Sequence, residues 1–532
     1  MQAFDRSAGL PREERLSIEA RYHELSRDWP KAIDSYRTLA GFFPDNLEYG
    51  LHLASALVSA GEAKDALASI DTLRQLPAPA GDDARVDLAE TRAATGLGDF
   101  KRALDSAQRA AAKGEARGAR LVVAQAKSAE GFALERLGRL DEAASAFAQA
   151  EQLFTAAGDR LGAAVAVQMS GTVLLDKADY AGARRAYDAA LAVFRQLGAQ
   201  QHIAATLNNI GNVLYDRVQL EEAKRHYEEV LRIDREIGDR RGAAGALGNL
   251  ANVLDTMGDL AGARAMQEAS LAAFRDVGDR RGTASTLNNF GNLLSELGEL
   301  AGARQRYEES LTITRETGYK RGQAFSKFGL ADVLLAQARF DEARATAEEG
   351  LALRTELRDE NNIAWSRAQL AAIAIEQRRT SDAEQLAGEA VAAFERLKAP
   401  ESGAVANAML ATALVEAGKA AEARAAAGRA ASLAQQGASK TPRFEAGLAG
   451  ALVLGATGQV RDAARQLEAL IAETRKHGYL PYELRARLLL GRLESQAGIA
   501  GAAARLAALE RDARAKGFEL VAVSAARAAS HH

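Results

Sequence analysis

"TLNNIGNVLYDRVQLEEA" occupies residues 206–223, and "TLNNFGNLLSELGELAGA" occupies residues 286–303. The two stretches are nearly the same, and their starts lie 80 residues apart. In the first stretch Leu207, Ile210 and Leu214 recur at intervals of three and four, which is the period of a helix rather than of a strand. A chain that contains nearly the same helix at a fixed interval is built of repeats, so its 532 residues do not indicate three or four ordinary domains.

Glycines set the interval between the copies. Those that we expect to end the first helix of a unit fall on one 40-residue grid, at Gly98, Gly138, Gly258, Gly298, Gly418, Gly458 and Gly498. The vacant grid points hold Ala178, Val218, Ala338 and Arg378, and two shorter steps lead back to Gly61 and Arg27. A glycine suits the left-handed residue that ends a helix and lets the chain turn. The grid predicts thirteen helix-turn-helix units.

Small side chains follow the same grid. Five residues after each grid point the residue is alanine, at Ala32, Ala66, Ala103, Ala143, Ala183, Ala223, Ala263, Ala303, Ala343, Ala383, Ala423, Ala463 and Ala503. Seven residues before each grid point the residue is glycine or alanine, except in one unit, which has Thr91. Two antiparallel helices that cross closely need small side chains at the crossing, where a leucine would cost roughly 1–3 kcal/mol by overpacking. The pattern therefore predicts tightly packed hairpins.

The charge balance and the lack of cysteine exclude several classes of protein. The chain has 68 basic and 71 acidic residues and no cysteine. It therefore lacks the cationic field that a nucleic-acid partner requires. Disulfides, thiolate zinc sites and cysteine nucleophiles are excluded as well.

The N-terminal sequence lacks the apolar stretch of a signal peptide. The longest apolar stretch, at residues 447–458, is too short and too rich in glycine to cross a bilayer. We expect a cytoplasmic protein without a membrane partner.

The sequence contains no motif of a known catalytic site. It has no G-x-x-x-x-G-K-[ST] loop, no H-E-x-x-H and no G-x-S-x-G. The histidines are scattered among distant units, and none has a second histidine at ligand spacing. Carboxylates that follow the turns, such as Glu221 and Glu222, favour a helix N-terminus through its dipole. We expect no catalytic residue, no metal and no cofactor.

The small residue of the first helix, the turn glycine and the alanine of the second helix resemble the signature of the tetratricopeptide repeat family. The resemblance covers roughly residues 15–525. The first unit is similar to the 34-residue form and ends in "FFPDN" at residues 42–46. The 40-residue units, with "GDRRG" joints at residues 238–242 and 278–282, resemble the lengthened variety in kinesin light chains, spindle-orientation adaptors and bacterial signalling regulators. Leucines such as Leu207 replace the tryptophan of the family.

This resemblance implies an all-α fold, an α-solenoid superhelix of about 13 helix-turn-helix units. We expect an N-terminal segment at residues 1–14, two shorter units at 15–80, a continuous array of 40-residue units at 81–400, less regular units at 401–525 and a tail at 526–532. "LPAPAGDD" at residues 76–83 is the expected internal linker. His531 and His532 resemble the remnant of a purification tag.

Asparagines recur on one face of the repeated helix. Asn208 and Asn212 are four residues apart and share a face, and Asn288 and Asn292 repeat this arrangement. The resemblance implies that these positions face a concave peptide-binding groove. An amide can pair with both the N–H and the C=O of an extended backbone. The candidate binding residues are Asn208, Asn212, Asn249, Asn252, Asn288, Asn292, Asp332, Arg241, Arg281 and Arg321, the arginines being suited to an acidic peptide.

A structural interpretation of the same residues stays open. In the family, asparagine is common at the Asn212 position and at the neighbouring position of Asn209, Asn249 and Asn289, where it satisfies backbone groups between repeats. The arginines of the "GDRRG" joints can simply solvate a turn. By this interpretation Asn208 and Asn288 are the more informative pair, because the resemblance does not account for them.

An apolar patch is the second candidate for a binding site. Phe325, Phe328 and Trp365 occupy groove-side positions in the ninth and tenth units. They suit a ligand with a hydrophobic anchor. Self-association, or cover by the next turn of the superhelix, are the alternatives.

Three hypotheses of function follow. The first is a non-catalytic scaffold or adaptor that binds a peptide or an extended protein segment in the concave groove. The second is the regulatory or sensor region of a larger bacterial signalling protein that carries a kinase, a cyclase or a transcription regulator. The third and most remote is an enzyme with an unrecognised site.

Overall fold

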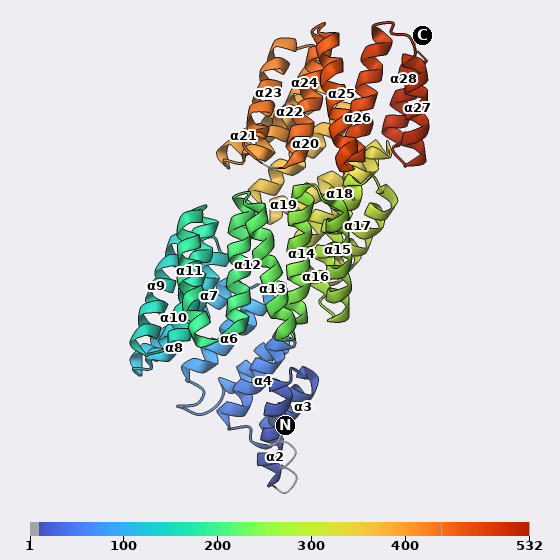
Figure 1. Cartoon of the computed structure of the whole chain (residues 1–532). Coiled ribbons are helices and arrows are strands. Elements are labelled where there is room, and N and C mark those ends of the chain that lie inside the picture. The colour runs from blue at the N-terminus through green and yellow to red at the C-terminus, as the bar shows by residue number, and fades with distance from the viewer. Residues whose placement is uncertain (1–9, 438, 531–532) are drawn as a thin grey trace. The chain divides into compact units, whose positions relative to one another are not determined.

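The chain folds into consecutive helical hairpins. The computed structural model describes residues 10–437 and 439–530, and these residues form 27 helices and no strand. Successive helices pack against each other in antiparallel pairs, for example α8 with α9, α14 with α15 and α22 with α23 (Figure 1). The predicted all-α solenoid of helix-turn-helix units is confirmed, with thirteen hairpins among the described residues.

The bounds of the helices follow the 40-residue grid. The first helices of the hairpins are α2 (Arg12–Leu25), α4 (Leu47–Ser59), α6 (Ala84–Leu97), α8 (Arg120–Arg136), α10 (Arg160–Asp176), α12 (Gln200–Asp216), α14 (Arg240–Met257), α16 (Arg280–Glu296), α18 (Lys320–Ala336), α20 (Glu360–Glu376), α22 (Pro400–Glu416), α24 (Lys440–Ala456) and α26 (Leu480–Gln496). The second helices are α3 (Trp29–Phe42), α5 (Ala63–Leu73), α7 (Phe100–Ala116), α9 (Leu140–Ala156), α11 (Tyr180–Leu197), α13 (Leu220–Glu236), α15 (Leu260–Asp276), α17 (Leu300–Glu316), α19 (Phe340–Glu356), α21 (Thr380–Arg396), α23 (Ala420–Ala434), α25 (Val460–His477) and α27 (Ala502–Ala515). One further helix, α28 (Glu519–Ala529), follows the last hairpin.

The chain divides into two compact units, which are described separately. The first ends at Val213 and the second begins at Leu214, within α12. The expected linker at residues 76–83 lies inside the first unit, between α5 and α6. Beside it, Arg74 Nη2 lies 2.7 Å from Oδ1 of the fully buried Asp87. This ion pair joins the residue that follows α5 to α6, so it holds the two ends of the connection together.

The ends of the chain differ in detail from the expected segments. Helix α2 already begins at Arg12, inside the segment expected at 1–14, and α28 extends to Ala529, into the expected tail. Residues 1–9, His531 and His532 lie outside the described residues. No helix in the described part of the chain is long and apolar enough to span a membrane.

The backbone at the grid points confirms the predicted register. Gly258 and Gly298 have φ values of 85° and 76°. The grid points without glycine are left-handed as well, with φ of 58° at Ala178, 61° at Val218 and 57° at Ala338. A side chain with a Cβ is strained in this conformation. The turn therefore imposes its geometry even where the residue is unfavourable for it.

The buried alanines confirm the register in all but the last hairpin. Twelve of the thirteen grid alanines, from Ala32 to Ala463, have no exposed surface. The expectation for Ala503 is wrong, because Ala503 is exposed and Ala502 is buried in its place. Gly498 and Gly501 are both left-handed, with φ of 66° and 83°, so α27 starts later than its counterparts. The register of the last hairpin is therefore shifted by one residue.

The small residue of the first helix accommodates a ring from the second helix. A Cβ built on Gly291 would lie 2.5 Å from a ring carbon of Tyr307, and one on Gly131 would lie 2.9 Å from Phe147. Thr91, the exception in the sequence pattern, instead hydrogen-bonds the buried Ser106 at 3.0 Å. The predicted close approach of the two helices is therefore present. The small residue of the first helix leaves room for a ring of the second helix.

Candidate binding cavity

A cavity of about 650 Å³ lies within the second unit. One wall comes from the first helices of the eighth to tenth hairpins, α16, α18 and α20. The opposite wall comes from α24, α26 and the start of α28. These walls meet because α18 contacts α28 and α16 contacts α26, which brings together segments that are more than 150 residues apart.

Three asparagines of α16 line this cavity: Asn288, Asn289 and Asn292. Asn288 is 7% exposed, and its Oδ1 accepts a hydrogen bond from the Ser326 hydroxyl at 2.9 Å. Asn289 is half-buried and makes no hydrogen bond within the described residues. The sequence made Asn288, with Asn208, the more informative pair of candidates, whereas the structure gives the Asn288 oxygen a partner in the next hairpin and leaves Asn289 open to the cavity.

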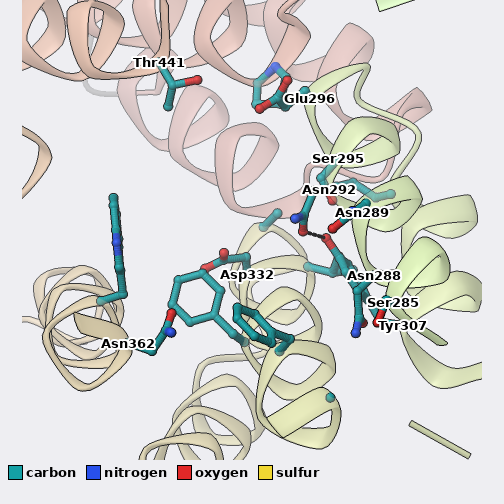
Figure 2. Close-up of a pocket in the computed structure, with 18 of the residues that line it drawn as sticks. Ser285, Asn288, Asn289, Asn292, Ser295, Glu296, Tyr307, Asp332, Asn362 and Thr441 are labelled. Atoms are coloured by element: carbon teal, nitrogen blue, oxygen red, sulfur yellow. Dashed lines mark hydrogen bonds between the residues drawn. The ribbon is translucent and has the colours of Figure 1, made fainter. Parts of the chain in front are cut away.

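Asn292 belongs to a bond that recurs along the chain. The Tyr307 hydroxyl donates to Asn292 Oδ1 at 2.7 Å, as Figure 2 shows. The same pair of positions, 15 residues apart, bonds Tyr187 to Thr172 at 3.2 Å. In the hairpin before that of Asn292, the contact from Gln267 to Asn252 is longer, at 3.5 Å. This position therefore joins the two helices of one hairpin through side chains, whereas the structural interpretation expected it to satisfy backbone groups between repeats; Asn292 is also exposed to the cavity.

Asp332 occupies the equivalent position in the next hairpin, but its environment differs. The residue opposite it, 15 positions on, is alanine, and the partner is instead Gln369 of α20, whose Nε2 donates to Asp332 Oδ1 at 2.7 Å. The side chain is exposed to the cavity, with Asn362 on one side and the asparagines on the other (Figure 2). The surrounding protein disfavours the charge and raises the pKa of Asp332 to about 6.

The apolar patch lies in the same cavity as the asparagines. Phe325, Phe328 and Trp365 all line it, and Phe325 remains 39% exposed. The guanidinium of Arg354 stacks on Phe328, 4.5 Å from the ring centroid. Arg354 is 3% exposed, and burial lowers its pKa to about 10. Residues of both sequence-derived candidates therefore line the same cavity.

The opposite wall was not found from the sequence. It contains Thr441, Pro481, Tyr482, Arg485 and Phe518. Arg485 forms a two-pronged ion pair with Glu445, with N–O distances of 2.6 and 3.0 Å. The sequence did contain one indication of this wall. Several joints between hairpins have an aspartate that caps the next helix, and an aromatic residue replaces it at Tyr319, Tyr479 and Phe518. Tyr319 and Phe518 line the cavity.

A pair of carboxyl groups lies at the edge of the cavity. Glu296 lines it and interacts with Asp255 of α14, and Glu296 Oε2 and Asp255 Oδ1 are both buried without a hydrogen-bond partner among the described residues. Burial, reinforced by the charge of Asp255, raises the pKa of Glu296 well above its usual value. Burial therefore favours the protonated form of Glu296. The Tyr479 hydroxyl donates to the Asp255 carbonyl at 3.5 Å, so the pair lies where the two walls meet.

The arginines of the joints staple neighbouring hairpins. Arg241 Nε lies 2.6 Å from Asp279 Oδ2, and Arg321 lies 3.7 Å from Asp359, each 38 residues on. At the joint between these two, Tyr319 takes the place of the aspartate. The guanidinium carbon of Arg281 lies 4.2 Å from the centroid of the Tyr319 ring. A shallow depression lined by Arg241 and Arg281 shares one residue, Ser285, with the cavity.

The remaining predicted residues lie elsewhere. Asn208 and Asn212 are on α12 in the first unit, and Asn249 and Asn252 are on α14 in the second unit. None of these four is among the described residues that line the cavity. Of the ten predicted groove residues, the cavity thus brings together Asn288, Asn292 and Asp332. The described residues contain no group of three or more histidine, aspartate or glutamate side chains that could hold a metal ion.

Comparisons with known proteins agree with this fold. Residues 163–236, 202–276 and 242–316 match the tetratricopeptide repeat model. No curated protein matches the chain. Among solved structures, the APC/C hetero-tetramer Cut9–Hcn1 is similar over 98% of this chain and 96% of that chain, with a TM-score of 0.50 and 14% identity, which concerns the fold alone.

Two further solved structures are similar to a part of the chain. The apo form of RapI matches 66% of this chain and 98% of its own, with a TM-score of 0.48 and 15% identity. The apo form of the quorum sensor NprR from B. thuringiensis matches 64% of this chain and 98% of its own, with a TM-score of 0.45 and 15% identity. Residues 163–316 thus match tetratricopeptide repeats, and the helical hairpins on both sides of this stretch continue the same 40-residue register.

Proposed function

We propose that the chain is a non-catalytic interaction protein that binds a peptide or an extended segment of a partner protein in the cavity of its second unit. The observation that carries this proposal is that one cavity holds both an unbonded amide and an exposed aromatic ring. An amide that is free to pair with a backbone, Asn289, lies in the same cavity as the exposed ring of Phe325. An extended segment needs both kinds of contact, one for its backbone and one for a side chain.

The size and the lining of the cavity fit such a segment. A volume of about 650 Å³ suits a few residues of chain rather than a folded domain. Among the described residues that line it, seven of 23 are aromatic, although aromatics make up 5% of the sequence. Aromatic side chains provide large contact areas and are enriched at the centres of interfaces. None of the described lining residues is a histidine.

Affinity capture with variants of the cavity tests this function. The full chain is immobilised and exposed to extract from the source cells, and the captured proteins are compared between variants. Phe325→Ser and Asn289→Ala remove contacts that the cavity offers and break no hydrogen bond between the described residues, so we expect the partner to be lost while helicity and melting stay unchanged. Leu357→Ser is the matched control, because Leu357, the residue that follows α19, is 40% exposed and does not line the cavity. Equal capture by all three variants would refute the function.

A further inference from the structure

We propose that the cavity selects a partner segment in which a lysine or arginine side chain lies next to an apolar side chain, and that Asp332 pairs with this cation. The inference rests on the proposed function and names the chemistry of the partner. The joint arginines suggested an acidic peptide in the sequence analysis, whereas this inference gives the partner segment a basic residue. Arg241 and Arg321 are already paired with aspartates.

Asp332 is the unneutralised charge that the cavity presents. Its Oδ1 accepts a hydrogen bond from the neutral amide of Gln369 at 2.7 Å, and its side chain is exposed to the cavity. No lysine, arginine or histidine in the described chain forms an ion pair with it. Although Arg354 and Gln369 favour the ionised form, the loss of water around the carboxylate dominates and raises the pKa of Asp332 to about 6. A ligand cation would supply the missing counter-charge.

The other charged groups of the cavity already have partners. Arg485 is paired with Glu445 at 2.6 Å, and burial beside Asp255 raises the pKa of Glu296, which favours its neutral form. Arg354, which is 3% exposed, donates to the Asn362 carbonyl at 2.9 Å and to the Ser366 hydroxyl at 2.7 Å. Its guanidinium therefore offers the cavity little surface for an anion.

The rings around Asp332 suit the rest of a basic side chain. Phe328, Trp365 and Tyr482 line the same cavity. Aromatic faces attract cations, and the methylene stem of lysine or arginine packs on apolar surface while its charged end reaches a carboxylate. Because Asn289 can pair with a backbone that continues through the cavity, the structure assigns the cation to a side chain rather than to a chain terminus.

Three short peptides with the same apolar residue test the assignment. They are acetyl-Phe-Lys-amide, acetyl-Phe-Gln-amide and acetyl-Phe-Glu-amide, which differ in the charge of the second side chain. The chain has two tryptophans, so the Trp29→Phe variant leaves Trp365 as the fluorescent reporter of the cavity. We expect the lysine peptide to bind with a Kd about tenfold lower than the other two.

The variants identify the residue responsible. Asp332→Asn should abolish the preference for the lysine peptide. Asp341→Asn is the matched control, because Asp341 also accepts a hydrogen bond from a glutamine, Gln377 at 3.2 Å, but lies outside the cavity. Circular dichroism establishes that both variants are folded.

Three results would overturn the inference. They are equal binding of the lysine and glutamate peptides, a lysine preference that survives Asp332→Asn, and no fluorescence change with any of the peptides. None of these results refutes the proposed function. That function is tested separately, by whether the Phe325→Ser and Asn289→Ala variants lose the captured partner.

Discussion

Tyr307 donates its hydroxyl proton to Asn292 Oδ1 at 2.7 Å, and its ring fills the space left by glycines of two successive hairpins. A Cβ on Gly291 would lie 2.5 Å from this ring, and one on Gly329 would lie 2.2 Å from it. One side chain thus joins α17 to its own first helix and to the first helix of the next hairpin. Both of those helices line the cavity, so its wall depends on how this ring is packed.

Gly329→Ala should therefore destabilise the chain. The added methyl group collides with the Tyr307 ring, and overpacking of this kind costs roughly 1–3 kcal/mol. Combining it with Tyr307→Leu, which removes the ring, should recover part of the loss, as a double-mutant cycle by urea denaturation would measure. Gly388→Ala is the control, because nothing lies within 4 Å of its Cβ, and it should be neutral or stabilising. Additive effects of Gly329→Ala and Tyr307→Leu would contradict the packing.

The shifted register of the last hairpin predicts opposite results at two grid alanines. Ala303→Leu should cost roughly 1–3 kcal/mol, because Ala303 is fully buried between helices. Ala503→Leu should change stability by less than about 0.5 kcal/mol, because Ala503 is exposed. Thermal melting of the two variants measures the difference. A comparable loss at both positions would show that the register does not shift.

Replacing Ala338 by glycine should stabilise the chain. Ala338 has a φ of 57°, a conformation that costs a residue with a Cβ roughly 1–2 kcal/mol. Part of this gain is offset by the greater freedom of glycine in the unfolded chain, so we expect a net gain of about 0.5–1 kcal/mol. Ala345→Gly, at an exposed position inside α19, should instead cost about 1 kcal/mol. Urea midpoints of both variants test the sign.

The Asp255–Glu296 pair predicts a dependence of stability on pH. The pKa of Glu296 is raised in the folded chain, so the folded state holds this proton more tightly than the unfolded state does. Its contribution to the free energy of unfolding therefore falls as the pH rises above the ordinary pKa of glutamate. Glu296→Gln keeps a hydrogen-bond donor for Asp255 and does not ionise. The urea midpoint should fall less between pH 5 and pH 8 in this variant than in the natural chain, and equal falls would contradict the raised pKa of Glu296.

The sequence was sufficient to predict the hairpins because their determinants are local. Gly258 ends α14 and Ala263 lies in the first turn of α15, only five residues later. The spacing between them in the sequence therefore shows where the two helices of the hairpin pack together. The prediction extended to grid points without glycine, where Val218 adopts the left-handed turn with a φ of 61°. It was wrong at Ala503, because Gly501, a second left-handed residue, delays the start of α27.

The candidate site was only half predictable. The residues of α16 and α18 stood out for different reasons: Asn292 recurs at the same position in neighbouring copies, and Phe325 places an aromatic ring at a groove-side position. The opposite wall depends on the small rotation between successive hairpins, which accumulates over many copies and leaves no trace in the spacing of any one of them. Tyr482 and Phe518 therefore could not be assigned to the cavity in advance. Whether Asn288 or Asn289 is free also depends on a contact with Ser326, 38 residues away.

The most direct test of the account is photo-crosslinking from inside the cavity. A photoreactive phenylalanine replaces Phe325 in the full chain, and a second protein carries it at Leu357, which is exposed outside the cavity. After illumination in extract from the source cells, mass spectrometry maps the crosslinked peptide. The account predicts that position 325, and not position 357, captures one defined segment with a basic residue beside an apolar one. Crosslinking that is equal at both positions, or absent at position 325, would contradict it.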